Sequence, residues 1–380
     1  MQAETAAPTN KGEPPTEVDP VKHDKILFIG AALSAVFGGA VAAQTPPNDE
    51  EILRAWLASP HADASSEAFR HWDKEAEIPG SCAVCHSTTG IVDYLAAPQS
   101  KAGVIDHPVP IGTTVECSAC HNPGAQSLGE VAFPSGAVVA MTDGSAVCTV
   151  CHQGRTSGGD VRAAVEGVGD DTVSATISFV NIHYAAAAAT NLGTAVGGGY
   201  EYDGQTYAGP FGHVPGLGTC ITCHQPHETT VSLESCTACH QGATEFRAIR
   251  TTPLDILGDG RTAAGMGVVI DDLHARLEAA IKTYAVETGG GAIVYSDAAY
   301  PYFFNDLNAN GEVEDGEAAF PNRYQSWTPR LLRAAYNFQF VGKDHGAFAH
   351  NPHYALQLMI DSIADLATVS SVDASGLQRP

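Results

Sequence analysis

The sequence has 380 residues, 44% of them hydrophobic, and it carries 43 acidic against 19 basic side chains, a formal net charge of −24. A surface this acidic repels phosphate backbones and anionic headgroups, which excludes nucleic acid and anionic lipid from the expected partners. It suits docking on a basic patch of another protein.

The N-terminal 43 residues have the pattern of an export leader. Lys22 and Lys25 precede an apolar run over 26–43 that ends in small residues, as in a secretory signal cleaved after Ala43. The run is just long enough to span a membrane, so a retained anchor is the alternative. The acidic stretch before Val21 fits neither, and we hypothesise that translation starts at Val21; another type of codon there would exclude this. We expect a periplasmic or extracellular protein, membrane-bound only if 26–43 is retained.

Five Cys-x-x-Cys-His motifs follow, and they use all ten cysteines of the chain. A Cys pair followed directly by His is the attachment motif of c-type haem, in which the His is the proximal iron ligand. Zinc also binds Cys-x-x-Cys pairs but does not require that His, and no cysteine is left for a disulfide, an iron–sulfur cluster or a nucleophile. The sequence therefore predicts five covalently attached haem c groups. The motif residues are Cys82, Cys85, His86; Cys117, Cys120, His121; Cys148, Cys151, His152; Cys220, Cys223, His224; and Cys236, Cys239, His240.

The spacing of the motifs predicts the organisation of the chain. The last two motifs are close in sequence, which brings two haems close together, and no motif follows residue 240. The Gly-, Ala-, Thr- and Pro-rich sequence around the motifs predicts short helices joined by long loops, because porphyrins replace much of the apolar core. We predict a mainly α fold of multihaem cytochrome architecture, with extensive loops and little β-strand. Its parts are a leader over 1–43, a pentahaem lobe over 44–245 and a helical lobe over 246–380.

Each haem iron needs a second axial ligand unless it is catalytic. Only three methionines lie beyond the leader, so histidine is the expected second ligand at most sites. Ten further histidines compete for the five positions, and local context favours six of them. These are His61 and His71 before the first motif, both expected on a helix; His183 before an Ala run; His213 and His227 beside the fourth motif; and His350 near the C-terminus. His107, His274, His345 and His353 are reserves.

The C-terminal region has helical patterns. Apolar residues at 269, 270, 273, 277 and 281 recur at helical spacing and predict a helix that ends near Gly289. The segments 331–340 and 354–366 predict two more helices.

Between the first and second of these helices lies the sequence DLNANGEVEDGE, residues 306–317, which fits a twelve-residue calcium loop. It has oxygen donors at positions 1, 3 and 5, Gly at 6 and Glu at 12. Pro301 and Pro321 stand close by, so we expect a lone loop without two long flanking helices, and two Asn in place of Asp predict weak affinity. A polar turn without metal is the alternative. The candidate ligands are Asp306, Asn308, Asn310, Glu312, Glu314 and Glu317.

The chain resembles the bacterial multihaem c-type cytochromes over most of residues 50–370. The motifs carry the resemblance, together with "NIHY", "CHQPH" and the tail segments "WTPRLLRAAYNFQF" and "AFAHNPHYALQL". The resemblance implies electron transfer outside the cytoplasm, histidine distal ligands and other redox proteins as partners. We therefore expect an electron carrier and not an enzyme.

Two alternatives remain open. Some relatives of this broad kind polymerise into extracellular haem filaments, and a distal histidine supplied by a neighbouring copy of the chain would mark that function. A multihaem reductase acting on nitrite, hydroxylamine or a sulfur oxyanion would leave one iron open. Such reductases often replace a proximal His by Lys, which none of the five motifs does.

Overall fold

The computed structural model describes residues 47–96, 103–141, 143–184 and 186–380, and the predicted leader over 1–43 lies outside them. The described residues are mainly helices and loops with small two-stranded sheets, which confirms the predicted fold class. The residues from Pro47 to Pro380 form one compact unit. The α-helices are α1 (Asp49–Leu57), α2 (Glu67–Arg70), α3 (Gly80–His86), α4 (Thr88–Ala96), α5 (Cys117–Cys120), α6 (Pro123–Ser127), α7 (Ala146–Cys151), α8 (Gly158–Ala164), α9 (Ala187–Leu192), α10 (Cys220–Cys223), α11 (Leu233–Thr237), α12 (Met266–Glu287), α13 (Pro329–Gly342), α14 (Ala347–His350) and α15 (Pro352–Ala367).

The strands form three antiparallel pairs, each of two or three residues per strand. Short 3-10 turns lie at η1 (Gly193–Ala195), η2 (Phe246–Ala248) and η3 (Phe320–Asn322). The strand pairs are β1 (Glu77–Ile78) with β2 (Val109–Pro110), β3 (Glu130–Ala132) with β4 (Val138–Ala140), and β5 (Ile293–Tyr295) with β6 (Phe303–Asn305).

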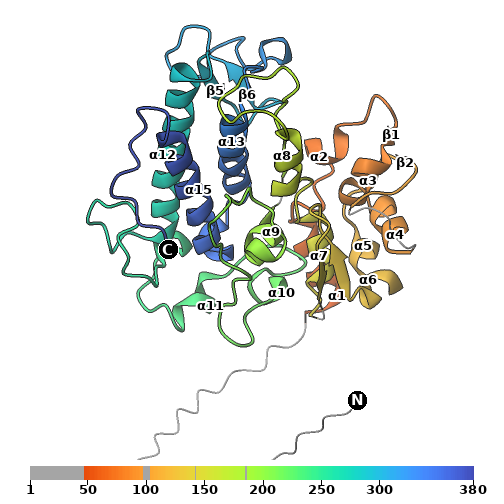
Figure 1. Ribbon diagram of the computed structural model, residues 1–380. Helices are drawn as coiled ribbons and strands as arrows, with labels where there is room; N and C mark the ends of the chain where they lie inside the picture. The colour runs from red at the N-terminus through yellow and green to blue at the C-terminus, as the bar shows by residue number, and fades with distance from the viewer. Residues whose placement is uncertain (1–46, 97–102, 142, 185) are drawn as a thin grey trace, which may run out of the picture. The chain divides into compact units, whose positions relative to one another are not determined.

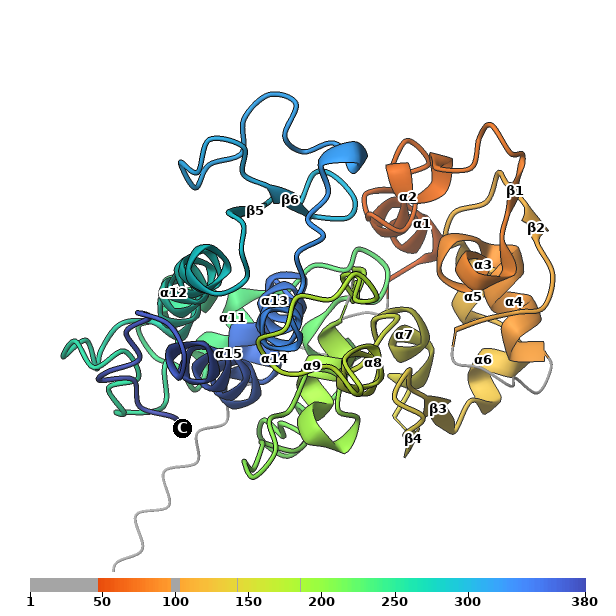
Figure 2. The ribbon, with the colours of Figure 1, turned by 45° about the horizontal axis from the view of Figure 1, so that its top comes forward.

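The three predicted C-terminal helices are present as α12, α13 and α15, and they form the main apolar core. Local sequence starts two of them, because Thr328 and Asn351 accept backbone N–H groups of the first turn and a proline follows each cap. In Figures 1 and 2 these helices lie side by side, with α1–α6 at the opposite side of the unit.

Polar side chains on α13 form hydrogen bonds with the segment between the third and fourth motifs. Asn337 donates to the Tyr200 carbonyl at 2.9 Å and accepts from the Tyr200 N–H at 2.7 Å. Gln339 accepts from the N–H of Ile182 at 3.2 Å, directly before His183. All of these groups are buried, so each lost hydrogen bond would cost about 1–3 kcal/mol. The segment that carries His183 is therefore held by α13.

Short helices carry the motifs, as predicted. Both cysteines of four motifs lie on α3, α5, α7 and α10, whereas α11 ends at Thr237, between the cysteines of the fifth motif. The predicted helix around His61 is wrong: α1 ends at Leu57, Pro60 follows, and His61 lies in the turns before α2. A proline disfavours helical geometry at the residue before it, which explains the end of α1. His71 is the residue directly after α2.

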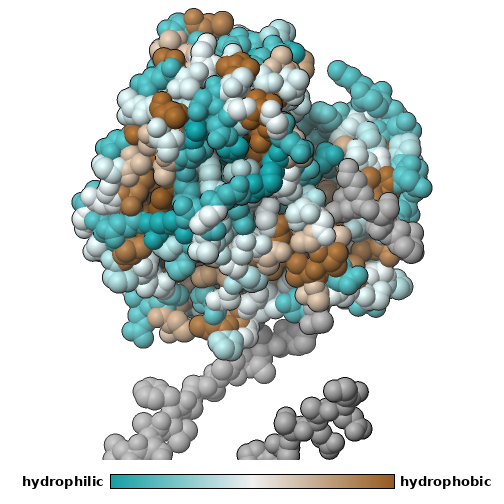
Figure 3. Space-filling model, in the orientation of Figure 1, coloured by the Kyte–Doolittle hydropathy of each residue, from teal (hydrophilic) through white to brown (hydrophobic). Residues whose placement is uncertain are grey.

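The face shown in Figure 3 is largely hydrophilic, with hydrophobic residues in separate small groups, in keeping with the acidic composition. None of the helices in the described ranges is both long and apolar enough to cross a membrane.

Close packing at α8 gives a stability prediction. A Cβ added to Gly158 would lie 2.2 Å from the Gly199 carbonyl oxygen, so Gly158→Ala must push backbone apart. We expect it to lower the free energy of unfolding by about 1–3 kcal/mol in denaturant titrations. At the neighbouring Gly159 the nearest atom is the Ser157 Oγ at 3.3 Å, and Gly159→Ala should change stability by less than about 1 kcal/mol. Equal effects of the two changes would contradict this packing.

Candidate haem-binding site

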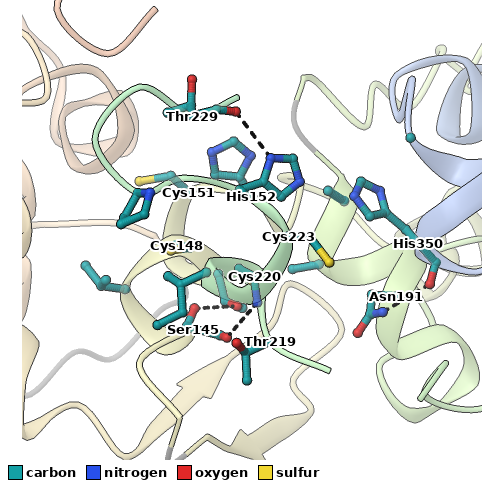
Figure 4. A pocket seen from close by; sticks show the side chains of 18 of the residues that line it. Ser145, Cys148, Cys151, His152, Asn191, Thr219, Cys220, Cys223, Thr229 and His350 are labelled. Carbon is teal, nitrogen blue, oxygen red and sulfur yellow. Dashed lines mark hydrogen bonds between the residues drawn. The ribbon is translucent and has the colours of Figure 1, made fainter. Parts of the chain in front are cut away.

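Every motif cysteine lines one cavity of about 1860 Å³. Ordinary ligand pockets have volumes of about 300–1,000 Å³, so this cavity has room for more than one large group. Its walls come from α3, α5, α7, α10 and the loops between them. The helices α9 and α14, which carry no motif, contribute as well. Figure 4 shows cysteines of α7 and α10 around the same space as His152 and His350.

Ten of the histidine rings that line this cavity lie in five pairs. Each pair joins one motif histidine to one histidine from outside the motifs, and all ten rings line the cavity. The pairs are His86 with His183, His121 with His227, His152 with His61, His224 with His350 and His240 with His213, with ring centres 5.9, 6.1, 6.4, 6.2 and 6.0 Å apart.

These separations fit a metal ion between the two rings. A metal–imidazole bond is about 2.0–2.1 Å long, and a five-membered ring with bonds near 1.35 Å places each atom about 1.15 Å from its centre. Two imidazoles on opposite sides of one metal therefore have centres about 6.3 Å apart. The five observed distances, 5.9–6.4 Å, lie around this value. The donor set thus fits five haem c groups, each bonded to two thiols and two imidazoles.

Hydrogen bonds orient several of these rings through Nδ1. His86 donates from Nδ1 to the Ala68 carbonyl oxygen at 2.7 Å, and His224 donates from Nδ1 to the Thr229 carbonyl oxygen at 3.3 Å. This pattern favours the tautomer with the proton on Nδ1 and leaves Nε2 free to bind a metal.

Burial favours the neutral form of four of the paired rings. It lowers the pKa of His152 and the pKa of His183 to about 4 each. A histidine binds metal through a neutral ring, so these side chains are in the ligating form at neutral pH. Burial lowers the pKa of His61 and of His86 as well.

Hydrogen bonds of their backbone groups hold three of the non-motif histidines at the cavity. His61 is held by its carbonyl oxygen, which accepts from the Val115 N–H at 3.1 Å just before the second motif. His183 has a positive φ of 67°, and its N–H donates to the Asn181 side chain at 2.9 Å. His350 ends α14, and its carbonyl accepts from Asn191 at 3.0 Å (Figure 4).

The fourth motif is flanked by partners of two other motifs. His227 lies three residues after His224, in a turn closed by the Gln225 N–H donating to the Thr230 carbonyl at 2.8 Å. That turn faces His227 toward His121 in a nearly parallel pair, with an interplanar angle of 10°. His213, in the loop that precedes the motif, pairs with His240. One segment, 213–227, thus contributes to three of the five pairs.

His71 does not join a pair. Its Nδ1 lies 2.9 Å from a Glu67 carboxylate oxygen one turn earlier, and its ring packs edge-on against Trp72. Trp72 in turn packs against His86, so a tryptophan occupies the position beside that motif histidine. Of the reserve histidines, His107 bonds Asp93 and Asp106 at the surface, His274 packs on Phe338, and His345 and His353 line the cavity without a ring partner among the described histidines.

The motifs touch one another through their sulfur atoms. The sulfur atoms of Cys85 and Cys151 lie close enough to interact, and so do those of Cys148 and Cys220. The Cys151 thiol also donates to a carbonyl of the first motif at 3.7 Å, and the Cys220 N–H donates to Ser145 Oγ at 3.1 Å. The third motif is therefore in contact with both the first and the fourth.

The sequence offered no signal for Asp344, which acts on a paired histidine. Both of its carboxylate oxygens accept from His350 Nδ1, at 2.8 and 2.9 Å. Burial alone would lower the pKa of His350, but the hydrogen bond and charge of Asp344 outweigh burial and raise it. Asp344 lies in the turn between α13 and α14, and His350 is the last residue of α14. A spacing of six residues between a turn and the end of a short helix matches no helical or strand period, so only the folded chain reveals the contact.

The loop over 306–317 is closed around its first and last carboxylates. Asp306 and Glu317 are buried, with 8% and 3% exposure. Asp306 accepts from the N–H groups of Asn310 and Gly311 at 3.3 and 2.7 Å, and Glu317 accepts from those of Leu307 and Glu314 at 2.8 and 3.0 Å. The flanking elements are β6 and η3, so two long helices are absent here, as predicted.

The side chains in the middle of this loop make contacts of their own. Asn308 and Asn310 donate to Glu314 at 2.7 and 3.0 Å, and Lys282 on α12 donates to the Gly311 carbonyl at 2.7 Å. Glu312 is exposed. Within the described ranges no group of three or more His, Cys, Asp or Glu side chains forms a metal cluster, so an ion here would depend on amide and carbonyl oxygens as well.

Comparison with known proteins finds similar c-type polyheme cytochromes in Geobacter sulfurreducens. OmcB, in the strains DL-1/KN400 and ATCC 51573/DSM 12127/PCA, is 27% identical over 374 residues, covering 79% of this chain and 46% of OmcB. OmcC of the latter strain is 28% identical over 386 residues, covering 86% of this chain and 48% of OmcC. The chain spans about half the length of the curated relatives it matches. No protein-family model and no solved structure matches it significantly.

Proposed function

We propose that the chain is an electron-transfer protein with five haem c groups, each held by one Cys-x-x-Cys-His motif and by a second histidine. It relays electrons between other redox proteins outside the cytoplasm. The haem irons supply one-electron chemistry when bound, and the residues of the chain bind them, orient them and set their surroundings.

The five histidine pairs carry this proposal. Each motif histidine faces one non-motif histidine at a distance that suits a metal between them, and both members of every pair come from this one chain. Two imidazoles would be available to each iron, which would leave no position for a substrate. This favours a relay over a reductase. It also removes the need for a histidine from a neighbouring copy, which a filament with shared ligands would require.

Contacts between motifs support an order for the relay. Sulfur contacts join the first motif to the third and the third to the fourth. The fourth motif is next to the second through His227 and next to the fifth through His213. Because each thiol would bond to the edge of a porphyrin, contacts between thiols would bring those edges together. The sites of His152 and His224 are therefore the junction of the route, and the other three sites are its ends.

We also propose that residues 306–317 bind Ca²⁺ in a stabilising role. The observation that supports it is the convergence of two buried carboxylates, Asp306 and Glu317, on the backbone of the same loop. The remaining oxygen ligands would be Asn308, Asn310 and the carbonyl of Glu312, with Glu314 at position 9.

Removing one non-motif histidine tests the relay. The purified protein should carry five haems, show a low-spin spectrum and bind carbon monoxide poorly. In His213→Ala one of the five should become high-spin and bind carbon monoxide, because His240 loses its partner. Absorption and electron paramagnetic resonance spectra measure both effects.

His71→Ala is the matched control, since His71 lies near a motif but belongs to no histidine pair. Its spectra should equal those of the unmodified protein. A high-spin haem in the unmodified protein, together with turnover of nitrite or hydroxylamine, would replace the relay by a reductase. Filaments in which an axial histidine crosses between copies would overturn the pairing within one chain.

A further inference from the structure

The group that accepts the hydrogen bond from His350 Nδ1 differs chemically from the acceptors of two other paired histidines. His86 and His224 donate to neutral backbone carbonyls. His350 donates to both oxygens of a carboxylate, that of Asp344, at 2.8 and 2.9 Å. Among the ten paired histidines in the described residues, His350 is the one with an ion-pair contact to an acidic side chain.

The Asp344 carboxylate is built into the fold. Its side chain is 3% exposed, and Oδ1 also accepts from the Gly346 N–H at 3.0 Å, in the turn that starts α14. The His350 carbonyl is fixed at the same time by Asn191 from α9. Both the ring and the carboxylate are thus held in place by the fold.

A buried carboxylate on Nδ1 changes the properties of a ligating imidazole. It fixes the ring orientation and makes the ring a stronger electron donor to a metal on Nε2. Its negative charge also stabilises the more positive, oxidised metal, and this effect is larger in a buried site than in water. Both effects favour the ferric over the ferrous state.

We infer that Asp344 is a positioning residue that orients His350 and lowers the reduction potential of the haem held by Cys220, Cys223 and His224. This inference rests on the proposed pairing of His224 with His350. The lowered potential lies at the junction of the route, where it would set how electrons divide between the ends.

Asp344→Asn in the full, haem-loaded chain tests the inference, because Asn keeps the size and an oxygen acceptor but removes the charge. Spectroelectrochemical titration should show one of five transitions moved to higher potential. We expect the reduction equilibrium of that haem to shift about tenfold, which is about 59 mV for one electron. All five haems should remain low-spin. Asp344→Glu, which restores the charge, should move the potential back toward that of the unmodified protein.

Two further variants assign the result. Asp361→Asn neutralises another buried carboxylate, which pairs with Arg379 away from the histidine pairs, and should move no transition. His350→Ala should turn one haem high-spin and identify its transition as the one that Asp344→Asn moves. Five low-spin haems with unmoved potentials in Asp344→Asn would overturn the role of Asp344 but not the pairing of His224 with His350. A fully low-spin His350→Ala protein would overturn the pairing and, with it, this inference.

Discussion

The double change Cys148→Ser and Cys151→Ser should yield a protein with four haems in place of five and a markedly lower melting temperature. These cysteines lie on α7, where Ala146, Thr149 and Val150 are buried, so the lost group lies against the interior of the unit. Unfilled space in a protein interior costs about 24 cal/mol per Å³, so about 150 Å³ left empty would cost about 3–4 kcal/mol. Haem counting by pyridine haemochrome and thermal melting measure the two effects.

The matched control is Cys236→Ser with Cys239→Ser. It should remove one haem as well, but α11 buries none of its residues, so the melting temperature should fall less. Rapid-mixing reduction distinguishes the two sites further. Loss of the third site should slow reduction of the haems beyond it, whereas loss of the fifth should remove only its own signal. Identical behaviour of the two double variants would contradict a junction at His152.

Removing Ca²⁺ should lower the melting temperature of the protein, and Glu317→Gln should abolish this response. An ion that binds only the folded loop stabilises the folded state by mass action, about 2.7 kcal/mol at a hundredfold excess over Kd. Glu317 is 3% exposed and is the expected bidentate ligand, so loss of its charge should weaken binding strongly. Calorimetry with added calcium and with a chelator measures the effect.

Glu312→Gln is the control for the calcium loop. Position 7 of such a loop contributes its backbone carbonyl, and the Glu312 side chain is exposed, so this variant should keep the full response to calcium. Melting temperatures that do not depend on calcium or chelator would leave 306–317 as a polar turn without metal.

Local patterns in the sequence predicted the helices well. The apolar spacing of 269–281 gave α12, and the cap-and-proline starts at Thr328 and Asn351 belong to α13 and α15. The short strand pairs escaped prediction, because strands of two or three residues have too little periodicity to recognise. The prediction of a helix around His61 is wrong, because Pro60 disfavours helical geometry directly before it.

Sequence context narrowed the ten non-motif histidines to six but could not select the five that lie in pairs. Partners such as His86 and His183 are nearly a hundred residues apart, and their contact depends on hydrogen bonds from α13 and from the loop after the third motif. Sequence context singled out His71 together with the five that lie in pairs. Only the folded chain shows that the His71 ring forms a hydrogen bond with Glu67 and packs against Trp72. Ligation by the other five remains a prediction.

In some pairs the motif histidine comes after its partner in the sequence, and in others before it. This order has a consequence for assembly. A chain that crosses a membrane N-terminus first presents His61 before His152 and His213 before His240, so these two sites can close as soon as their motifs emerge. The motif histidines 86, 121 and 224 must wait for His183, His227 and His350. In such a chain the site of His224 would close last, because His350 ends α14 and emerges after every motif. We expect a maturing chain halted before residue 350 to leave the site of His224 without its second histidine.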